Sequence, residues 1–205
     1  MKRTFDIVVS FIGLVALFPL LVLAAVAIKL GSPGPVIFKQ RRVGRGFRPF
    51  LIYKFRTMIN DAPSRGLSIT VGQDPRITQV GKLLRVTKID ELPQLVNVLK
   101  GDMTFVGPRP EVPRYVDLFR QQYEEILKVR PGITDLASLK YSDEARLLES
   151  FDNPEQEYIT HVLPEKILLA QEYIKRSSLL FDLEVLFQTL LKLFEYRVSR
   201  ERTLP

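Results

Sequence analysis

Two adjacent carboxylates, Asp90 and Glu91, stand among basic residues in the middle of the chain. Arg85 and Lys88 precede them, and Arg109 follows. Carboxylates flanked by fixed cations are suited to attack a phosphate, or to hold a metal ion beside one, because the cations offset the repulsion between like charges. Asp90–Glu91 is therefore the candidate centre of phosphate chemistry.

The same dipeptide also has the pattern of an ordinary helix start. Asp90 is suited as an N-cap, Pro93 is tolerated in a first turn, and Gly101 fits the position just past the last turn. The apolar residues between them recur at helical spacing. Because a helix N-terminus also binds anions, the residues alone leave a capped helix and an active site both open.

The composition of the whole chain narrows the chemistry. Its 205 residues carry a net charge of +7 with a pI near 9.7, which favours anionic partners such as nucleic acid, anionic lipid or phosphorylated substrates. The chain has no cysteine, so disulfides and thiolate metal sites are excluded. The single histidine, His161, argues against a zinc site and against a serine–histidine hydrolase.

An uncharged run at Ile7–Ile28 is long enough to cross the ~30 Å hydrocarbon layer of a membrane. The alternatives are a cleaved signal peptide, a single spanning helix and a re-entrant hairpin. The small residues Ala25–Ala27 resemble a cleavage site, but the run is longer than the apolar region of about 7–15 residues that signal peptides usually have.

Pro19 lies near the middle of this run and should break the helix there, because proline lacks a backbone donor and clashes with the preceding turn. Each half would then be about 18 Å long or less, too short to cross alone. Basic residues flank both ends, and a hairpin would keep both ends on the cytosolic side. A kinked spanning helix is also feasible, so the residues leave the two topologies open.

The rest of the chain predicts short strands and helices joined by turns and loops. The expected elements are strands at Val36–Phe38 and Pro49–Phe55 joined by a basic turn, a surface loop at Asn60–Asp74, helices at Ile77–Arg85, Val112–Lys128 and Pro164–Phe194, a rigid basic turn at Arg130–Thr134, and an acidic peripheral segment at Ser142–His161. The apolar stripe of the last helix fits either core packing or a position in the membrane interface.

Arg109 and two further cations fit phosphate binding. Lys54 and Arg56 lie on one face if their segment is extended, because strand side chains alternate. Arg109 lies between Pro108 and Pro110, which restrict its backbone and suit it to bidentate contact with a phosphate. An ordinary surface turn is the alternative for Arg109.

Four segments, taken in their order and spacing, resemble a known family. They are KFRTM (Lys54–Met58), GKLLR (Gly81–Arg85), DELPQLVNVLKGDMTFVGPRP (Asp90–Pro110) and RPGIT (Arg130–Thr134). Together with the apolar segment before them, they closely resemble the bacterial sugar transferase family, in the small catalytic-domain form of the monotopic polyprenyl-phosphate phosphoglycosyl transferases. The resemblance covers nearly the whole chain except about Asp135–Leu169.

This resemblance implies an activity and a set of roles. The implied reaction moves a sugar 1-phosphate from a UDP-sugar to undecaprenyl phosphate, with Mg²⁺ as cofactor and UMP as product, in the first membrane step of a bacterial glycoconjugate pathway. Asp90 is implied as a nucleophile that forms a covalent phospho-sugar intermediate, Glu91 as a metal or proton-transfer partner, and both as metal ligands. The implied phosphate-binding residues are Lys54, Arg56, Arg85, Arg109 and Arg130.

The expected fold is α+β, with a membrane-embedded re-entrant helix at residues 1–30 and a catalytic unit at residues 31–205. The re-entrant helix is broken at Pro19, and the catalytic unit has a small β-hairpin and several amphipathic or interfacial helices around the active site. The implied location is the cytosolic face of the bacterial inner membrane, with both termini cytosolic. Membrane lipid is an expected partner, nucleic acid is not, and a homo-oligomer stays open.

The chain departs from the family pattern at two places. Phe18–Pro19 stands where the family commonly has Ser-Pro, and Asp135-Leu136-Ala137 stands where it usually has Gly-Trp-Ala. The identity of the sugar therefore does not follow from the resemblance. Two other functions fit the residues: a non-catalytic, membrane-anchored protein that binds anions, and a hydrolase of the same substrates.

Overall fold

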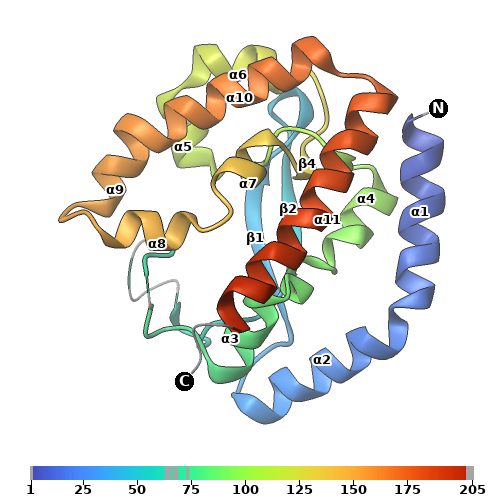
Figure 1. Ribbon diagram of the computed structural model, residues 1–205, viewed down its shortest axis with the longest axis vertical. Coiled ribbons are helices and arrows are strands. Elements are labelled where there is room, and N and C mark those ends of the chain that lie inside the picture. Colours follow the sequence, from blue (N-terminus) through green and yellow to red (C-terminus); the bar gives the residue numbers. More distant parts are fainter. Residues whose placement is uncertain (1, 63–65, 67–68, 73, 202–205) are drawn as a thin grey trace.

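The computed structural model describes residues 2–62, 66, 69–72 and 74–201, which form helices around two small sheets (Figure 1). The helices are α1 (Lys2–Ala16), α2 (Phe18–Gly31), α3 (Gln79–Val86), α4 (Gln94–Lys100), α5 (Pro113–Leu118), α6 (Arg120–Ile126), α7 (Leu136–Lys140), α8 (Glu144–Glu149), α9 (Pro154–Glu157), α10 (Leu163–Arg176) and α11 (Leu179–Glu201). Strands β1 (Ile37–Val43) and β2 (Pro49–Phe55) pair antiparallel, and β3 (Thr104–Val106) and β4 (Gly132–Thr134) pair parallel. The predicted α+β class is confirmed.

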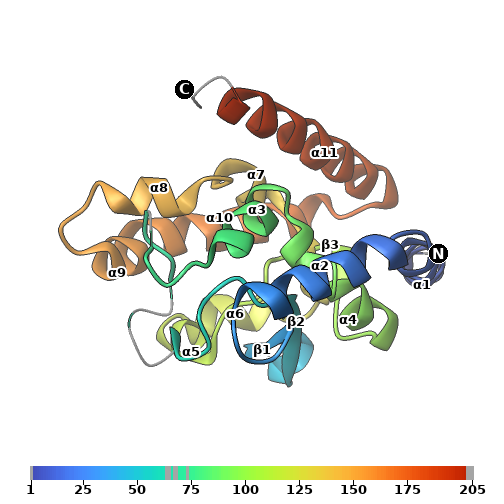
Figure 2. The same ribbon diagram turned by 90° about the horizontal axis from the view of Figure 1, so that it is seen from below.

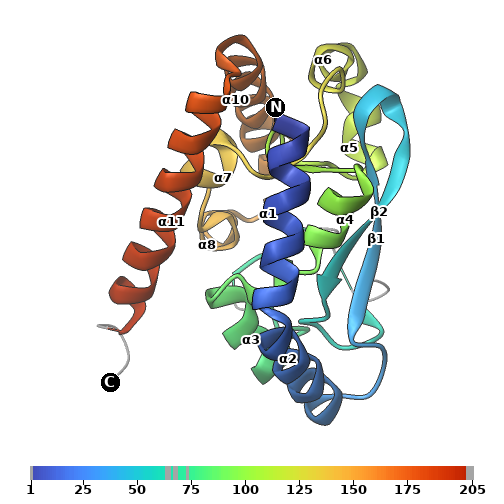
Figure 3. The same cartoon turned by 90° about the vertical axis from the view of Figure 1, so that its right-hand side faces the viewer.

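The N-terminal helices α1 and α2 form a pair bent by 62° (Figure 3). The break falls at Leu17, and Pro19 lies in the first turn of α2, where its missing N–H removes no helical hydrogen bond. The predicted break is confirmed, two residues before the proline. Within the described residues, no single helix has the length and apolarity to span a membrane, and the bent pair meets that test only as a pair, by length and composition alone.

The β1–β2 hairpin is longer than the sequence predicts. Ile37 pairs with Phe55 and Val43 with Pro49, so the strand predicted to end at Phe38 continues through the basic residues after it. The reversal is confined to the segment between Val43 and Pro49. Pairing with β2 thus extends β1 through basic residues that the sequence assigned to the turn.

Two other predictions of secondary structure were wrong. The helix predicted at Val112–Lys128 is divided into α5 and α6, because the backbone at Phe119 leaves helical geometry. The segment predicted as a rigid turn at Arg130–Thr134 contributes strand β4, which pairs with β3. The pairing requires close approach: a Cβ on Gly132 would lie 2.2 Å from the amide nitrogen of Gly107.

The largest core lies where α5, α6 and α10 meet the end of β1 (Figure 1). Its buried residues are Val43, Tyr115, Val116, Tyr123, Ile126, Leu127, Leu148, Tyr158, Val162, Leu163, Ile167 and Ala170. Leu148 and Tyr158 come from the segment that the sequence placed at the periphery, so that prediction is wrong for these two buried residues. The predicted loop Asn60–Asp74 includes residues outside the described ones, and its Gly72 amide donates to the carbonyl of Ala145 in α8.

Helix α11 lies on the opposite side of the molecule from the hairpin (Figure 2). One side of the helix buries Phe181 and Val185 against Val106 and Tyr173. Another leaves apolar side chains exposed, including Leu180 and Phe187. The apolar stripe therefore divides between core packing and an exposed face, and the expected membrane-interface position of that face stays a prediction.

Polar side chains of α1 bind the backbone of β3. Asp6 accepts a hydrogen bond from the amide of Phe105, and Lys2 donates from Nζ to the carbonyl of Val106 at 2.8 Å. Lys2 also forms an ion pair with Asp182 of α11 at 2.7 Å. The Tyr173 hydroxyl donates to Asp182 and lies within hydrogen-bond distance of Lys2. This partly buried network joins the first helix and the last helix to one strand.

We predict that Lys2→Met destabilises the protein by about 1–3 kcal/mol, because Asp182 would remain buried without its cation. The thermal unfolding midpoint of detergent-solubilised protein measures the effect. Lys175→Met is the matched control, since Lys175 is exposed at the end of α10. Equal midpoints for the two variants would contradict the prediction.

Candidate active site

The Asp90–Glu91 dipeptide lies in a tight turn between α3 and α4 rather than at a helix start. Residues Ile89–Glu91 form a 3₁₀ turn, and Lys88 before it has left-handed backbone angles of φ 56° and ψ 16°. Helix α4 begins at Gln94, and no side chain caps it. The predicted N-cap role of Asp90 is therefore wrong. Gly101 does end α4 in the left-handed conformation, as predicted.

Glu91 is held by two cations from different parts of the chain. Lys54 of β2 donates from Nζ to Glu91 at 2.8 Å, and the Arg109 guanidinium bonds both carboxylate oxygens. Burial alone would raise the pKa of Glu91, but Arg109 and Lys54 together hold it well below the usual range. Glu91 in turn raises the pKa of Arg109, while burial lowers that of Lys54. Glu91 is thus a fixed anion that orients two cations.

Asp90 is in the opposite condition. Its side chain is buried, and its Oδ1 has no hydrogen-bond partner among the described residues. Burial, and then the charge of Glu91, raise the pKa of Asp90. A buried carboxylate oxygen without a partner costs stability, so the fold does not need this group as a structural element. Among the described residues, Asp90 is thus the member of the pair with a carboxylate oxygen that makes no hydrogen bond.

Arg85 is fixed near the pair by two threonine hydroxyls. Its Nε donates to Thr57 at 2.8 Å, and its Nη1 donates to Thr70 at 3.2 Å. Burial lowers the pKa of Arg85, and the charge of Asp90 partly offsets that effect. The sequence predicted Arg85 but gave no signal for Thr57 and Thr70, because single threonines in a motif and in a loop carry no spacing pattern.

Two predicted phosphate-binding residues are engaged elsewhere. Arg56 donates from Nη2 to the backbone carbonyl of Ser32 at 2.8 Å and to the Ser32 hydroxyl at 2.9 Å, which fixes the end of α2. Arg130 donates from Nε to the carbonyl of Gly101 at 2.9 Å, at the end of α4. Neither is bonded to Asp90 or Glu91, and phosphate binding by these two residues stays a prediction. Lys54 of β2, by contrast, is bonded directly to Glu91.

Asp135 orients the loop that carries Arg109, which the sequence did not predict. Its carboxylate accepts a hydrogen bond from the Arg109 amide at 3.0 Å and caps α7 through the Ser138 amide at 2.7 Å. The Asp-x-x-Ser pattern before a helix is the signal that could have indicated the cap. The aspartate that departs from the family pattern is therefore part of the support for Arg109.

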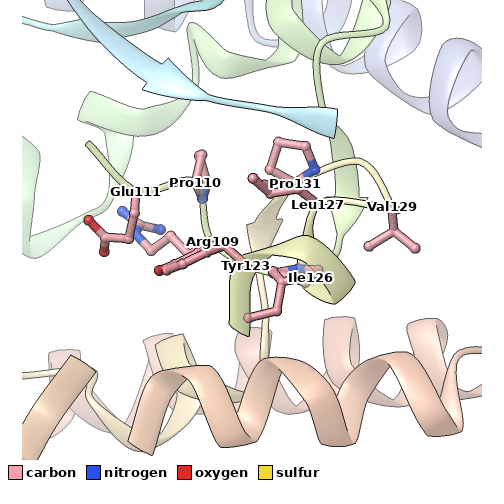
Figure 4. A pocket seen from close by; sticks show the side chains of 9 residues that line it. Arg109, Pro110, Glu111, Tyr123, Ile126, Leu127, Val129 and Pro131 are labelled. Carbon is pink, nitrogen blue, oxygen red and sulfur yellow. The ribbon is translucent and has the colours of Figure 1, made fainter. Parts of the chain in front are cut away.

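Arg109 also lines a small pocket (Figure 4). Apart from Arg109 and Glu111, its lining is mainly proline and apolar residues from α6 and the loops around it. Neither Asp90 nor Glu91 lines this pocket, so it is separate from the carboxylate pair.

The donor set at the pair is compatible with Mg²⁺. No group of three or more His, Cys, Asp or Glu residues that could bind a metal occurs in the described part of the chain. Mg²⁺ is often bound by one or two carboxylates together with substrate phosphates and water, and the unpartnered Oδ1 of Asp90 fits that pattern. Glu91 is already neutralised by two cations, so Asp90 is the better ligand of the two.

We predict that Asp90→Asn makes the protein more stable at neutral pH. A folded-state pKa above the unfolded value means that the protonated form of Asp90 is favoured in the fold, and this contribution is lost as pH rises through the folded pKa. Asparagine stays neutral, so the two proteins should unfold at similar temperatures in acid and diverge as pH rises. Thermal unfolding without substrate or metal, from about pH 4 to about pH 8, measures this divergence. A variant less stable at every pH would contradict it.

Comparison with known proteins finds the same family that the sequence motifs resemble. The family model described as bacterial sugar transferase matches residues 1–196. A UDP-N-acetylgalactosamine-undecaprenyl-phosphate N-acetylgalactosaminephosphotransferase of Aeromonas hydrophila is 40% identical over 194 residues, which cover 92% of this chain and 42% of that protein. A UDP-glucose:undecaprenyl-phosphate glucose-1-phosphate transferase of Escherichia coli (strain K12) is 37% identical over 198 residues, covering 95% of this chain and 40% of that protein. The chain thus spans about two fifths of the length of these two relatives.

A third relative is similar in length. The exopolysaccharide production protein PSS of Rhizobium leguminosarum bv. phaseoli is 38% identical over 197 residues, which cover 92% of both proteins.

Proposed function

Because the chain belongs to the bacterial sugar transferase family, we propose that it transfers a sugar 1-phosphate from a UDP-sugar to undecaprenyl phosphate and releases UMP. The observation that carries this proposal is the buried Asp90, whose Oδ1 has no hydrogen-bond partner in the described part of the chain, beside a Glu91 that two cations hold ionised. The names of relatives that use undecaprenyl phosphate with UDP-glucose or UDP-N-acetylgalactosamine support the same substrate classes.

The proposed mechanism uses Asp90 as the nucleophile. One carboxylate oxygen attacks the phosphorus that carries the sugar, the bond from that phosphorus to UMP breaks, and an aspartyl phospho-sugar remains. A phosphate oxygen of the lipid then attacks the same phosphorus and releases Asp90. Dividing one displacement into two means that the two anionic substrates need not occupy the site together.

The surrounding residues supply positive charge at fixed positions. Lys54 and Arg109 are held by Glu91, and Arg85 by Thr57 and Thr70, so these cations need little reorganisation when a phosphate arrives. Mg²⁺, when bound by Asp90 and the substrate phosphates, would neutralise charge on the phosphoryl oxygens. In this proposal Glu91 orients the cations, which refines the metal or proton-transfer role implied by the sequence.

Replacing Asp90 tests the reaction directly. We expect Asp90→Asn to lower UMP release by on the order of 10³-fold or more, because the amide is not a nucleophile. The assay combines purified protein, Mg²⁺, undecaprenyl phosphate and a panel of UDP-sugars. Asp117→Asn is the control, since Asp117 is an exposed carboxylate that faces Arg120. Robust turnover by Asp90→Asn would sink the nucleophile assignment.

Omitting the lipid separates transfer from hydrolysis. A transferase should release UMP beyond one equivalent per enzyme only when undecaprenyl phosphate is present. A hydrolase would release UMP continuously without it, with water as the acceptor. A non-catalytic anion-binding protein would release none with any UDP-sugar.

We further propose that the bent α1–α2 pair enters the bacterial inner membrane from the cytosolic face and returns to it, so that both termini are cytosolic. The exposed apolar side chains of α1 and α2 and their 62° bend support this topology. The chain has no cysteine, so Thr4→Cys introduces a unique thiol at an exposed position of α1. We expect a membrane-impermeant maleimide to label it in opened cells but not in intact spheroplasts, and labelling in intact spheroplasts would defeat the hairpin.

A further inference from the structure

Lys88 has an unusual backbone for its residue type. Its φ of 56° and ψ of 16° lie in the left-handed region, where glycine, asparagine and aspartate are the residues favoured. Lys88 adopts this conformation where the chain passes from α3 into the Ile89–Glu91 turn. Lysine gives no backbone advantage at this position, and its side chain is exposed.

The other cations around the carboxylate pair are already engaged. Lys54 and Arg109 bind Glu91, and Arg85 is bonded to Thr57 and Thr70. Among the described residues, Lys88 has neither a hydrogen bond nor an ion pair from its ammonium group. Lys88 is exposed and only one residue separates it from Asp90 in the turn, so its positive charge lowers the pKa of both Asp90 and Glu91.

We propose that Lys88 binds a phosphate oxygen of a substrate as that phosphate approaches Asp90. This inference rests on the proposed function, in which two phosphorylated substrates react at Asp90. An uncommitted ammonium on a flexible stem can follow a phosphate as it moves, whereas the engaged cations are fixed in place. The phosphate oxygens belong either to the nucleotide diphosphate or to the lipid phosphate, and both offer the same chemistry to lysine.

Two variants separate the charge of Lys88 from its backbone conformation. Lys88→Asn removes the charge and fits the left-handed region, so its thermal unfolding midpoint should equal or exceed that of the native protein. Lys88→Arg keeps the charge in the same strained backbone. The control is Lys82→Asn, which removes an exposed lysine from α3 and leaves the carboxylate pair untouched.

Binding and turnover are measured separately for each substrate. The binding probes are UDP and undecaprenyl phosphate, each titrated in the presence of Mg²⁺ at low and at high salt. We expect Lys88→Asn to weaken one probe about 10-fold at low salt and much less at high salt, because added ions screen the contact. The KM for the matching substrate should rise by a similar factor, Lys88→Arg should restore most of the loss, and Lys82→Asn should change neither. A loss confined to UDP assigns the nucleotide diphosphate, and a loss confined to undecaprenyl phosphate assigns the lipid.

Three results would overturn the inference. These are unchanged binding of both probes by Lys88→Asn, a loss that Lys88→Arg does not restore, and a loss that Lys82→Asn reproduces. A different measurement tests the proposed function: if that function is wrong, the native protein transfers no sugar phosphate. Weaker probe binding by Lys88→Asn would still support the phosphate contact in that case.

Discussion

The site depends on one partly buried anion, Glu91, that two cations from distant parts of the chain neutralise. Lys54 comes from β2 and Arg109 from the loop after β3, so the ion pairs join the hairpin, the turn after α3 and the second sheet. A buried charge is tolerated only when it is paired, and removing one partner leaves the other exposed to the full cost of burial. The three elements therefore have to meet at Glu91.

The position of Arg109 depends in turn on strand β3 and its neighbours. Strand β4 pairs with β3 on one side, and Asp135 fixes the Arg109 amide. Lys2 and Asp6 of α1 bind the backbone of β3 three to four residues before Arg109. A continuous path of contacts thus connects the N-terminal helix pair to the guanidinium that holds Glu91. Through this path, the proposed membrane segment and the proposed chemistry share one structural support.

Local patterns predicted the elements whose boundaries are set by neighbouring residues. Pro19 indicated the break between α1 and α2, and Gly101 indicated the end of α4, because proline and glycine act on their own backbone. Local patterns gave wrong predictions where contacts with distant segments, or the backbone of a neighbouring turn, determine the structure. The segment at Arg130–Thr134 is a strand because β3 lies beside it, and Asp90 is no N-cap because the left-handed Lys88 redirects the chain before the helix begins.

The sequence by itself determined the α+β class, the apolar broken N-terminus, the family resemblance and the carboxylate pair with its nearest cations. The resemblance rests on the order and spacing of four segments, and the other features follow from residue types and their local spacing. Only the tertiary structure decided how the surroundings of the two adjacent acids differ, because the spacing of residues does not encode burial or long-range partners. It gave Glu91 two cations and, among the residues that the structure describes, left an oxygen of Asp90 without a partner. It also directed Arg56 and Arg130 to backbone carbonyls and gave Lys88 its left-handed backbone just before the pair.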